Sequence, residues 1–590
     1  MTVLRHTAPR PAVAAVGSPL VSPRVVREPM LTTPPVRTVG LRLIRAAVLC
    51  GGLAAAIPSI VTAATVVATD TTQNTGTYAN GGGSLTITHA TNNPLLTLMG
   101  NANTSGVQTV IIGNSTNHEG RLLVSGGSDL LNNSGDGSVY VGLNSSATGT
   151  ATVTGAGSTW TNTSDLRVGY SGTGVLDVED QGLVTNLVGY LGENSGSSGT
   201  ATVTGAVSTW QNNSFLFVGN TGTGVLNVEN QGLVTNTIGV LGRNSGSNGT
   251  ATVTGDGSHW QNTELRVGQS GTGVLNVEAK GLVTNTFGSV GRDSGSSGTA
   301  TVTGDGSTWA NSQGLNVGGN SGAGGTGIVS VLDGGLVSVG TLLKVWNGDT
   351  VNLQPGGTIS THDFDFSLGT LNFTGGTLTI NGGEVTGLVT VPGGGLVTGT
   401  GNFLTGLSLA DGGAVSPGFS PETITATTGT WSGGGTYIWE INALATDGGA
   451  AGNATGWDLW EYTGPLSVTA TSGNPLLVEV HSLDALDMAG DLANFDSGSS
   501  YSWLIATAGN DAFSNLLAFA IDATDFQNAL GGGSFSLTNG EGGTELYLNF
   551  TPFTSTAAVP EPSSLLLALV GGASLLLYRR RSSTARTNPL

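Results

Sequence analysis

The sequence has almost no cysteine. Its only cysteine, Cys50, lies in an N-terminal segment that we expect to be removed from the mature chain. An exported protein without disulfide bonds depends on packing and backbone hydrogen bonds for its stability. The lack of thiols also excludes thiolate catalysis and cysteine-based metal sites from the mature chain.

Positive charge is scarce as well. The 590 residues include 18 Lys and Arg against 38 Asp and Glu. Between Ala64 and Tyr578 only seven cations stand against 37 acids, which gives this body a net charge of −30. Nucleic-acid binding needs many cationic contacts, so we expect no nucleic-acid partner. The charge is typical of a soluble extracellular protein.

Charged residues make up 9% of the chain and aromatic residues 6%, whereas glycine supplies 98 residues. Glycine costs a helix interior about 1 kcal/mol relative to alanine, which excludes a mostly helical fold. The strict three-residue glycine period of collagen is absent. Disordered chains are poor in apolar residues, but 38% of these residues are hydrophobic. The composition therefore predicts an all-β protein with many tight turns.

Residues 1–64 have the features of an export signal. Arg42 and Arg45 precede a short apolar run over residues 46–57, and small residues follow at positions 61–64. This order is typical of a secretory signal peptide, which engages the Sec export machinery. The run is too short to predict a lasting membrane span. The long stretch before it leaves two candidate start sites, Met1 and Met30.

The C-terminal end carries a second targeting signal. The motif Pro560, Glu561 and Pro562 precedes an apolar helix that we predict over residues 565–578. Three arginines follow the helix: Arg579, Arg580 and Arg581. Such charges hold the end of a membrane helix in the cytoplasm, so the segment is predicted to stop in the inner membrane.

The arrangement over residues 557–590 resembles the PEP-CTERM sorting signal. The resemblance implies that an exosortase-type membrane processing enzyme recognises Pro560, Glu561 and Pro562 and that the tail is removed. Some family descriptions label this tail an ice-binding protein C-terminal domain, a label that concerns the tail alone. A permanent C-terminal tail anchor is the alternative.

The middle of the chain is an array of repeats. Four copies of a segment such as TATVTGAGSTWTN place tryptophans 49 or 50 residues apart: Trp160, Trp210, Trp260 and Trp309. A second segment, such as GVLNVENQGLVTN, alternates with the first, and aligning the two halves the period to 24 or 25 residues. Degenerate copies extend the core of the array over residues 122–337.

A fixed period of this length predicts a solenoid. Each unit contains three short candidate strands, such as residues 151–154, 159–162 and 166–168, with glycines at the bends. Three strands per unit describe one coil of a parallel β-helix, in which no coil buries its apolar face alone. A propeller blade is the alternative for a 50-residue repeat, but blades do not split into two equivalent halves. We predict a parallel β-helix rod of about 14 coils over residues 65–425.

These units resemble the autotransporter-associated and PEP-CTERM-associated β-strand repeats, best over residues 124–337 and more weakly to Gly418. Residues 417–421 are similar to the segment that closes such rods, with Glu422 in place of its second glycine. Beyond Thr430 the chain becomes rich in aromatic residues. We predict a smaller C-terminal β-sandwich-like domain over residues 430–553 that caps the rod.

Candidate reactive groups are few. Glu179, Glu229 and Glu278 share one repeat position, which favours a solvated face over a Ca²⁺ site or a glycan-cleaving cleft. Asp363 and Asp365 form one isolated pair, for which we favour a loop over a metal site. His259 replaces a threonine of the other repeats, which indicates an exposed position. No nucleophile elbow or phosphate-binding loop is present, so we expect no catalytic residue, metal or cofactor.

The tryptophan column has two interpretations. Its side chains form a ligand-facing platform for sugars, or they pack inside the coils. An asparagine follows each tryptophan two residues later, at positions 162, 212, 262 and 311. We favour packing, with the asparagines bonded to the bends, because buried polar groups need partners.

These observations predict a non-enzymatic, secreted structural protein of the cell surface or extracellular matrix. The signal peptide exports it, and the PEP-CTERM-like tail sorts it through transient anchoring in the inner membrane. An adhesin or polysaccharide-binding protein with an exopolysaccharide partner is the first alternative. A β-helical polysaccharide lyase or glycosidase is the second.

Overall fold

The structure is a computed structural model, and it describes residues 66–68, 72–74, 77–79, 83–90, 93–133, 138–418 and 420–554. The predicted signal peptide and the sorting segment with its apolar helix, residues 565–578, lie outside the described residues, as do Pro560, Glu561, Pro562 and the three arginines. The described part is almost entirely β-structure. Its helical turns are three short 3₁₀ segments: η1 (Ala445–Asp447), η2 (Leu516–Ala518) and η3 (Glu541–Gly543).

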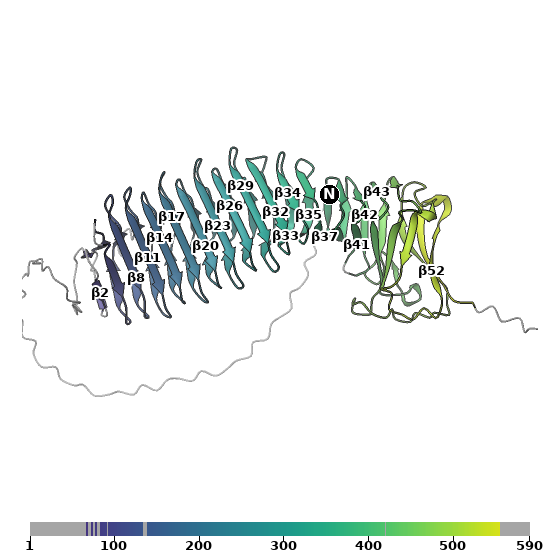
Figure 1. Cartoon of the computed structure of the whole chain (residues 1–590), viewed down its shortest axis with the longest axis horizontal. Helices are drawn as coiled ribbons and strands as arrows, with labels where there is room; N and C mark the ends of the chain where they lie inside the picture. The colour runs from purple at the N-terminus through teal and green to yellow at the C-terminus, as the bar shows by residue number, and fades with distance from the viewer. Residues whose placement is uncertain are drawn as a thin grey trace, which may run out of the picture. The chain divides into compact units, whose positions relative to one another are not determined.

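The repeat units stack as coils of a parallel β-solenoid of about 14 turns (Figure 1). One unit supplies β11 (Thr148–Thr154), β12 (Thr159–Asn162) and β13 (Leu166–Val168), close to the three strands predicted from the sequence. Each strand pairs in parallel with the equivalent strand of the next coil, as in β11 with β14 (Thr173–Glu179). The prediction of a parallel β-helix is confirmed.

Three faces run along the stack. The first face is a 13-stranded sheet. Besides β11 and β14 it comprises β2 (Thr72–Asn74), β5 (Leu95–Leu98), β8 (Glu119–Val124), β17 (Ser198–Thr204), β20 (Thr223–Glu229), β23 (Asn248–Thr254), β26 (Thr272–Glu278), β29 (Ser297–Thr303), β32 (Thr326–Leu332), β34 (Thr350–Leu353) and β36 (Thr370–Phe373).

The second and third faces are built from the shorter strands of each coil. With β12, the second face comprises β3 (Thr77–Ala79), β6 (Asn103–Val107), β9 (Asp129–Asn132), β15 (Leu183–Asn186), β18 (Thr209–Asn212), β21 (Leu233–Thr235), β24 (His259–Gln261), β27 (Leu282–Asn285) and β30 (Thr308–Asn311). With β13, the third face comprises β1 (Val66–Ala68), β4 (Ser84–Ile87), β7 (Thr109–Ile112), β10 (Val139–Val141), β16 (Gly189–Leu191), β19 (Phe215–Val218), β22 (Ile238–Leu241), β25 (Glu264–Val267), β28 (Phe287–Val290) and β31 (Leu315–Val317).

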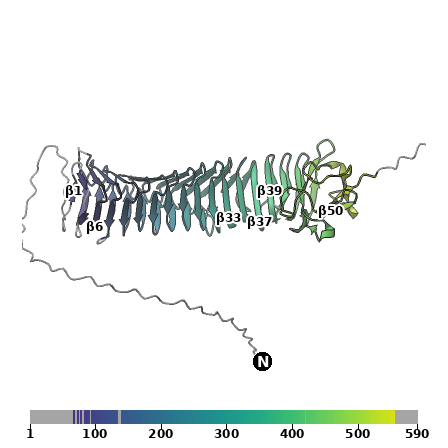
Figure 2. The same ribbon diagram turned by 90° about the horizontal axis from the view of Figure 1, so that it is seen from below.

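Longer strands follow the array. The strand β33 (Leu336–Val345) pairs with β30 through its first residues and with β31 through its last, so it serves both faces (Figure 2). The next long strands are β35 (Thr358–Asp365), β37 (Gly376–Thr386) and β39 (Gly395–Phe403). A separate four-stranded sheet contains β38 (Val389–Val391), β40 (Leu407–Leu409), β43 (Gly429–Trp431) and β48 (Leu466–Val468).

The interior follows from period-two alternation along each strand. On the first face, Val153, Val178, Val203 and Val228 stand at one register position, and each is fully buried. Their neighbours along the strands, which are threonines in two of these strands and acidic residues or asparagine in the other two, point outward. Burying a valine side chain stabilises a fold by about 1.5–3 kcal/mol, and this column continues from coil to coil.

The array alternates two kinds of coil. We call residues 148–172, 198–222, 248–271 and 297–325 the Trp coils, because each contains one tryptophan of the column. Residues 173–197, 223–247 and 272–296 are the Gly coils, in which a glycine stands where the Trp coils have leucine. The column Leu166, Gly189, Leu216 and Gly239 shows this alternation. The chemical repeat is therefore two coils, which explains the 50-residue period.

The turns of the Gly coils depend on the next Trp coil. Asp180 and Gln181 both have positive φ angles, 48° and 73°, a conformation that non-glycine residues rarely adopt. The backbone N–H of Gln181 donates to the hydroxyl of Ser208, which is fully buried in the following Trp coil. Ser258 and Ser307 accept the equivalent bonds in the next two pairs.

The segment after residue 430 differs from the prediction. The structure does not show a separate sandwich, because the strands continue the solenoid. Parallel pairs join β42 (Thr423–Ala426) to β47 (Leu459–Tyr462) and β44 (Thr436–Ile441) to β49 (Leu476–Ser482). Strand β51 (Phe519–Asp522) continues this stack.

Antiparallel strands end the described solenoid. Strand β53 (Glu545–Thr551) pairs in this sense with β50 (Tyr501–Thr507) and β52 (Ser534–Asn539). The remaining strands of this part are β41 (Ala414–Pro417), β45 (Ala450–Ala451) and β46 (Gly456–Trp457). The aromatic residues after Thr430 fill the last coils, as in the contacts of Trp431 with Trp460 and Tyr437. Aromatic enrichment alone did not distinguish wider coils from a new domain.

Candidate functional site

The tryptophan column lies inside the solenoid. Trp160, Trp210, Trp260 and Trp309 are all fully buried, so the ligand-facing interpretation is wrong and the packing interpretation is confirmed. For Trp210, Trp260 and Trp309 the reason is the glycine of the preceding coil. A Cβ atom added to Gly189 would lie 2.9 Å from the Trp210 ring, so only glycine leaves room for the indole.

The asparagines hold the indoles rather than the bends. The Trp210 indole N–H donates to Asn186 Oδ1 at 2.7 Å, and Asn186 Nδ2 donates to Asn212 Oδ1 at 2.7 Å. Equivalent bonds link Trp260, Asn236 and Asn262, and Trp309, Asn285 and Asn311. Each set joins a Gly coil to the Trp coil that follows it. Trp160, which precedes the first such pair, has no hydrogen-bond partner for its indole nitrogen among the described residues.

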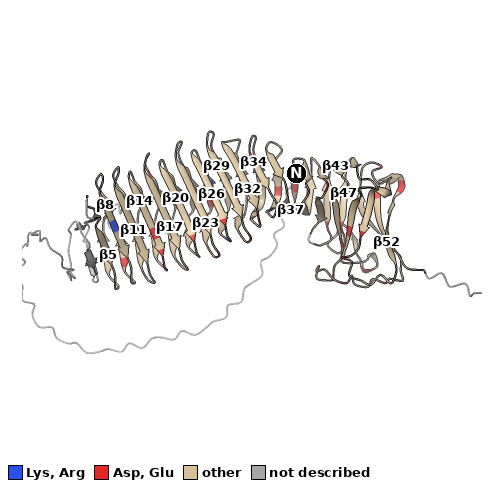
Figure 3. Ribbon diagram, viewed as in Figure 1, with Lys and Arg blue, Asp and Glu red and all other residues tan. Residues whose placement is uncertain are grey.

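The carboxylates predicted from the repeats lie on the first face. Glu179, Glu229 and Glu278 pair in register with threonines such as Thr204 and Thr254, and all three point outward. Figure 3 shows this face with acidic positions recurring from strand to strand and a basic position on β8. The column is a partly exposed face of interleaved hydroxyls and carboxylates.

The isolated aspartates lie in a strand, so the expectation of a loop is wrong. Asp363 and Asp365 belong to β35 and bind different partners. Asp363 Oδ1 accepts a bond from the Glu384 backbone N–H, and Asp365 forms an ion pair with Lys344. His259 is partly buried rather than exposed, and its ring lies 2.8 Å from the Thr284 hydroxyl. Burial lowers the pKa of His259.

The third face carries a surface that the sequence analysis missed. Its central row runs through the registered residues Tyr140, Arg167, Tyr190, Phe217, Val240, Arg266, Ser289, Asn316 and Lys344, of which Phe217, Val240 and Ser289 are buried. Side chains from the adjoining turns lie beside this row: Tyr170, Glu193, Arg243, Arg292 and Trp346. We call the two rows together the aromatic–cationic face. Aligning the middle residue of each third strand would have found the first row.

Arginines and rings pack on one another across neighbouring coils of this face. The Arg167 guanidinium lies 5.5 Å from the ring centroids of both Tyr140 and Tyr190. Arg243 lies 4.1 Å above the ring of Phe217, and the rings of Tyr190 and Phe217 are 5.1 Å apart. Cation–π contacts of this kind contribute about 0.5–2 kcal/mol each and fix the guanidinium in place.

Carboxylates pair with some of these cations. Arg167 contacts Asp165 at 2.7 Å and Glu193 at 3.0 Å, and Arg266 contacts Glu264 at 2.7 Å. Burial raises the pKa of Glu193 despite the lowering effect of Arg167. The Arg266 hydrogen bond lowers the pKa of Glu264. The face therefore holds both charged hydrogen-bonding groups and apolar rings in fixed positions.

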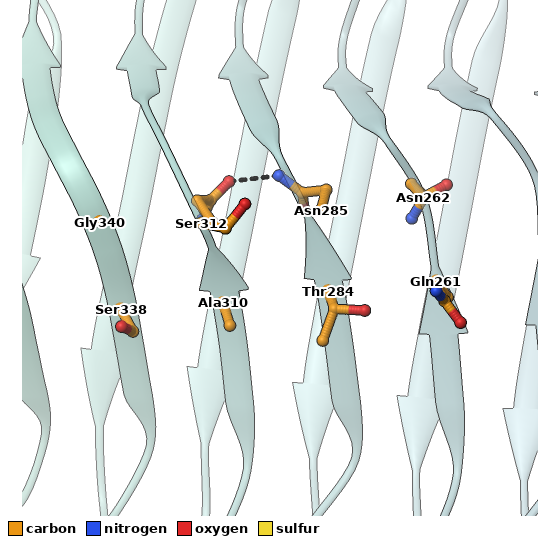
Figure 4. Close-up of a pocket in the computed structure, with 9 residues that line it drawn as sticks. Gln261, Asn262, Thr284, Asn285, Ala310, Ser312, Ser338 and Gly340 are labelled. Carbon is orange, nitrogen blue, oxygen red and sulfur yellow. Dashed lines mark hydrogen bonds between the residues drawn. The ribbon is translucent and has the colours of Figure 1, made fainter. Parts of the chain in front are cut away.

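A shallow hollow of about 320 Å³ lies on the second face (Figure 4). Gln261, Thr284, Ala310 and Ser338 line it along one row, and Ala310 supplies a small side chain where neighbouring coils have larger ones. Asn262 and Asn285 of the asparagine network lie beside this row (Figure 4). No charged side chain lines the hollow, so it provides neutral polar groups only.

The last coils contain a buried carboxyl cluster. Asp458 is fully buried, and its oxygens accept bonds from the backbone N–H groups of Glu422 at 2.8 Å and Glu440 at 3.0 Å. Burial, together with the charge of Glu440, raises the pKa of Asp458 well above its ordinary value. Burial and then Asp487 raise the pKa of Glu440 to about 7. Asp458 thus links two backbone segments through hydrogen bonds. Neither Asp458 nor Glu440 forms an ion pair with a Lys or Arg among the described residues.

No group of three or more His, Cys, Asp or Glu side chains among the described residues is placed to hold a metal ion. Within residues 66–554, as far as they are described, no helix has the length and apolar character needed to cross a membrane.

Comparisons with known proteins provide little. No family model matches the chain, and no curated protein sequence matches it. Among solved structures, the solenoid is similar to the crystal structure of a hyper-glycosylated fragment of TibA, whose glycosylation TibC catalysed. The identity is 20%, the match covers 56% of this chain and 91% of that fragment, and the TM-score is 0.31. A likeness this slight carries no argument about function.

Proposed function

We propose that this chain is a non-enzymatic structural protein of the cell surface or extracellular matrix. The observation that carries the proposal is the unbroken 13-stranded first face, which makes the solenoid a continuous spacer. Every coil hydrogen-bonds to its neighbours along the axis, so bending or stretching the stack breaks several backbone bonds at once. A spacer of this kind holds its two ends apart, as a structural surface protein requires.

The buried side chains of the array support the same role. The tryptophans, asparagines and serines of the array are used in coil-to-coil bonds, and their polar groups lie in the interior. On the first face the outward side chains repeat every two coils, as in Glu179, Glu229 and Glu278, which suits repeated weak contacts better than one reaction centre.

Export and sorting belong to the same proposal. The predicted signal peptide carries the chain across the inner membrane, and the apolar tail holds it there transiently. Pro560, Glu561 and Pro562 are then recognised by an exosortase-type enzyme, which releases the chain to the surface. Arg579, Arg580 and Arg581 keep the tail end in the cytoplasm until cleavage.

An adhesin or polysaccharide-binding role is the second candidate. The aromatic–cationic face favours it, because Tyr, Trp and Arg are the residues that dominate the binding energy of many interfaces. A spacer that also binds an exopolysaccharide would fix that polymer at a set distance from the cell. The two roles are compatible in one molecule.

Localisation tests the structural role. An epitope inserted after Ser245, in an exposed turn of the array, is detected by immunogold on intact cells that produce the protein. We expect surface label for the full chain. Label that appears only after the cells are permeabilised would contradict a surface role.

Two variants then separate sorting from catalysis. Glu561→Ala should retain export but leave the chain in the inner-membrane fraction, as shown by fractionation and C-terminal mass spectrometry. The triple variant Glu179→Gln, Glu229→Gln and Glu278→Gln should give the same surface label on intact cells as the native chain does. Depolymerisation of an acidic exopolysaccharide by the native chain, lost in the triple variant, would overturn the non-enzymatic proposal.

A further inference from the structure

The positive charges of the body gather on one face. Of the seven cations between Ala64 and Tyr578, five belong to the aromatic–cationic face: Arg167, Arg243, Arg266, Arg292 and Lys344. The other two, Arg121 and Lys280, lie on β8 and in the turn after β26. In a body with a net charge of −30, this is the face that an anionic partner meets with the least repulsion.

Two of these five cations have no carboxylate partner. Arg167, Arg266 and Lys344 form ion pairs with Asp165, Glu264 and Asp365. Arg243 and Arg292 form no ion pair with any residue that the structure describes. Arg243 interacts electrostatically with Glu193 and Arg292 with Glu264, but neither arginine is paired directly with these carboxylates, so both guanidinium groups can bind a ligand.

The guanidinium of Arg243 is already held in position. Its Nη1 donates to Asn220 Oδ1 at 3.0 Å, and the group lies over the Phe217 ring. A side chain that is fixed before binding loses less conformational entropy when a ligand arrives. Planar guanidinium groups also bind carboxylates through paired hydrogen bonds, which makes arginine well suited to this role.

The spacing of the two arginines defines the partner further. Arg243 and Arg292 follow equivalent strands, β22 and β28, of successive Gly coils. Strands of neighbouring coils lie about 4.8 Å apart, so the two positions are about 10 Å apart along the axis. This is close to the length of one disaccharide in an extended glycan chain. The rings of Tyr140, Tyr170 and Tyr190 continue the face beyond the arginines and offer apolar edges and hydroxyls to sugar rings.

From this arrangement we propose that the aromatic–cationic face binds an acidic polysaccharide with about one carboxylate per disaccharide, laid along the solenoid axis. The carboxylates pair with Arg243 and Arg292, and the sugar rings lie against the tyrosine side of the face. The inference rests on the proposed extracellular role and specifies the second candidate function. A nucleic acid fits poorly, because its densely spaced phosphates need many more free cations than two.

Binding is tested with the purified full-length chain, checked for β-structure by circular dichroism. Hyaluronan oligosaccharides serve as the probe, since they carry one carboxylate per disaccharide, and dextran is the neutral control. Calorimetry at low salt should show binding to hyaluronan and none to dextran. Equal binding of both polymers, or binding of neither, would overturn the proposal.

Matched variants locate the site. Arg243→Gln and Arg292→Gln should each weaken hyaluronan binding roughly tenfold, and the double variant should weaken it further. Lys280→Gln and Arg121→Gln remove cations from elsewhere and should change the affinity less than twofold. An equal loss in all four variants would show non-specific attraction, and tighter binding of poly-glutamate than of hyaluronan would show a peptide site instead. If hyaluronan does not bind but intact cells carry the surface label, this inference alone is refuted. Absence of surface label refutes the proposed function.

Discussion

The repeat array and the last coils stack the same kind of strand but bury different polar groups. The array buries neutral hydroxyls, amides and indoles, which bond in pairs across coils. The last coils bury carboxyls, with Asp458 fully enclosed and Glu440 beside it. A group in the array recurs about 10 Å away in the next pair of coils, so a buried charge would repel its own copies. Residues after 430 do not repeat, so Asp458 has no column of copies, and burial together with its carboxyl neighbour Glu440 raises its pKa instead.

The deletion of one coil should have the largest effect on stability, because it disrupts the alternation of Trp coils and Gly coils in the array. Removing residues 173–197 joins two Trp coils directly, so Trp210 meets Leu166 where Gly189 had left room. Removing residues 173–222 deletes one coil of each kind and retains the alternation. We expect the one-coil deletion to cost about 3–6 kcal/mol through overpacking and lost hydrogen bonds, and the two-coil deletion far less. Urea unfolding followed by tryptophan fluorescence measures both, and equal effects would refute the two-coil repeat.

Adding a single Cβ atom at a glycine of a Gly coil tests the same alternation of coils. A Cβ at position 239 would lie 2.6 Å from Asn262 Oδ1 and 2.8 Å from the Trp260 ring, whereas a Cβ at Gly322 meets nothing within 4 Å. Gly239→Ala should therefore lose about 2–3 kcal/mol of stability, and Gly322→Ala should be nearly neutral. Chemical denaturation of both variants shows the difference. A neutral Gly239→Ala would mean that the indole has room to move.

The buried serines make the next largest contribution. Ser258→Ala removes the acceptor for the Gln231 backbone N–H and leaves that donor unpaired, which costs about 1–3 kcal/mol. Ser245→Ala, in an exposed turn, is the control and should cost almost nothing. Faster hydrogen exchange at the turn of residues 229–232 in the first variant alone would confirm the bond. Unchanged exchange there would contradict it.

One position of the array is strained, and a substitution should relieve it. Val207 has a φ angle of 67° and is 75% exposed, whereas the other Trp coils have glycine at this turn position. A β-branched residue is disfavoured in this conformation. Val207→Gly should stabilise the chain by about 1 kcal/mol, seen as a higher midpoint in urea. A lower midpoint would show that the valine side chain makes contacts that outweigh its strain.

The sequence was sufficient for the parallel solenoid, because the column from Val153 to Val302 gave both the period and the inward positions. It also favoured packing for the tryptophans. It did not reveal why the period is 50 rather than 25 residues, since the pairing of Trp210 with Gly189 depends on contacts between coils. The aromatic–cationic face was missed for a similar reason: Arg167, Tyr190 and Phe217 become neighbours only after the coils are stacked.

The separate domain predicted at the end of the rod is not shown by the structure. Aromatic enrichment after Thr430 predicted a separate sandwich, but residues such as Trp431 and Trp460 fill wider coils of the same stack. Aromatic side chains provide the same apolar area in either arrangement. Strand register, which decides between them, was not visible in a segment without repeats.

The central claim is that pH changes the stability of the last coils more than that of the array, and hydrogen exchange with mass spectrometry tests it directly. The raised pKa of Glu440, about 7, means that the folded state holds its proton more tightly than the unfolded state does. Stability of the last coils should therefore be greatest at low pH and fall as the pH rises from about 4.5 to about 7, by about 1 kcal/mol for this partly buried group. Between pH 5 and pH 8, corrected exchange should increase more in residues 436–462 than in residues 173–296, where separate groups such as Glu193 and His259 have pKa values shifted in opposite directions. Glu440→Gln should reduce the change in the last coils and leave the part that Asp458 contributes. An equal pH response in both regions, or an undiminished response of the last coils in Glu440→Gln, would contradict the claim.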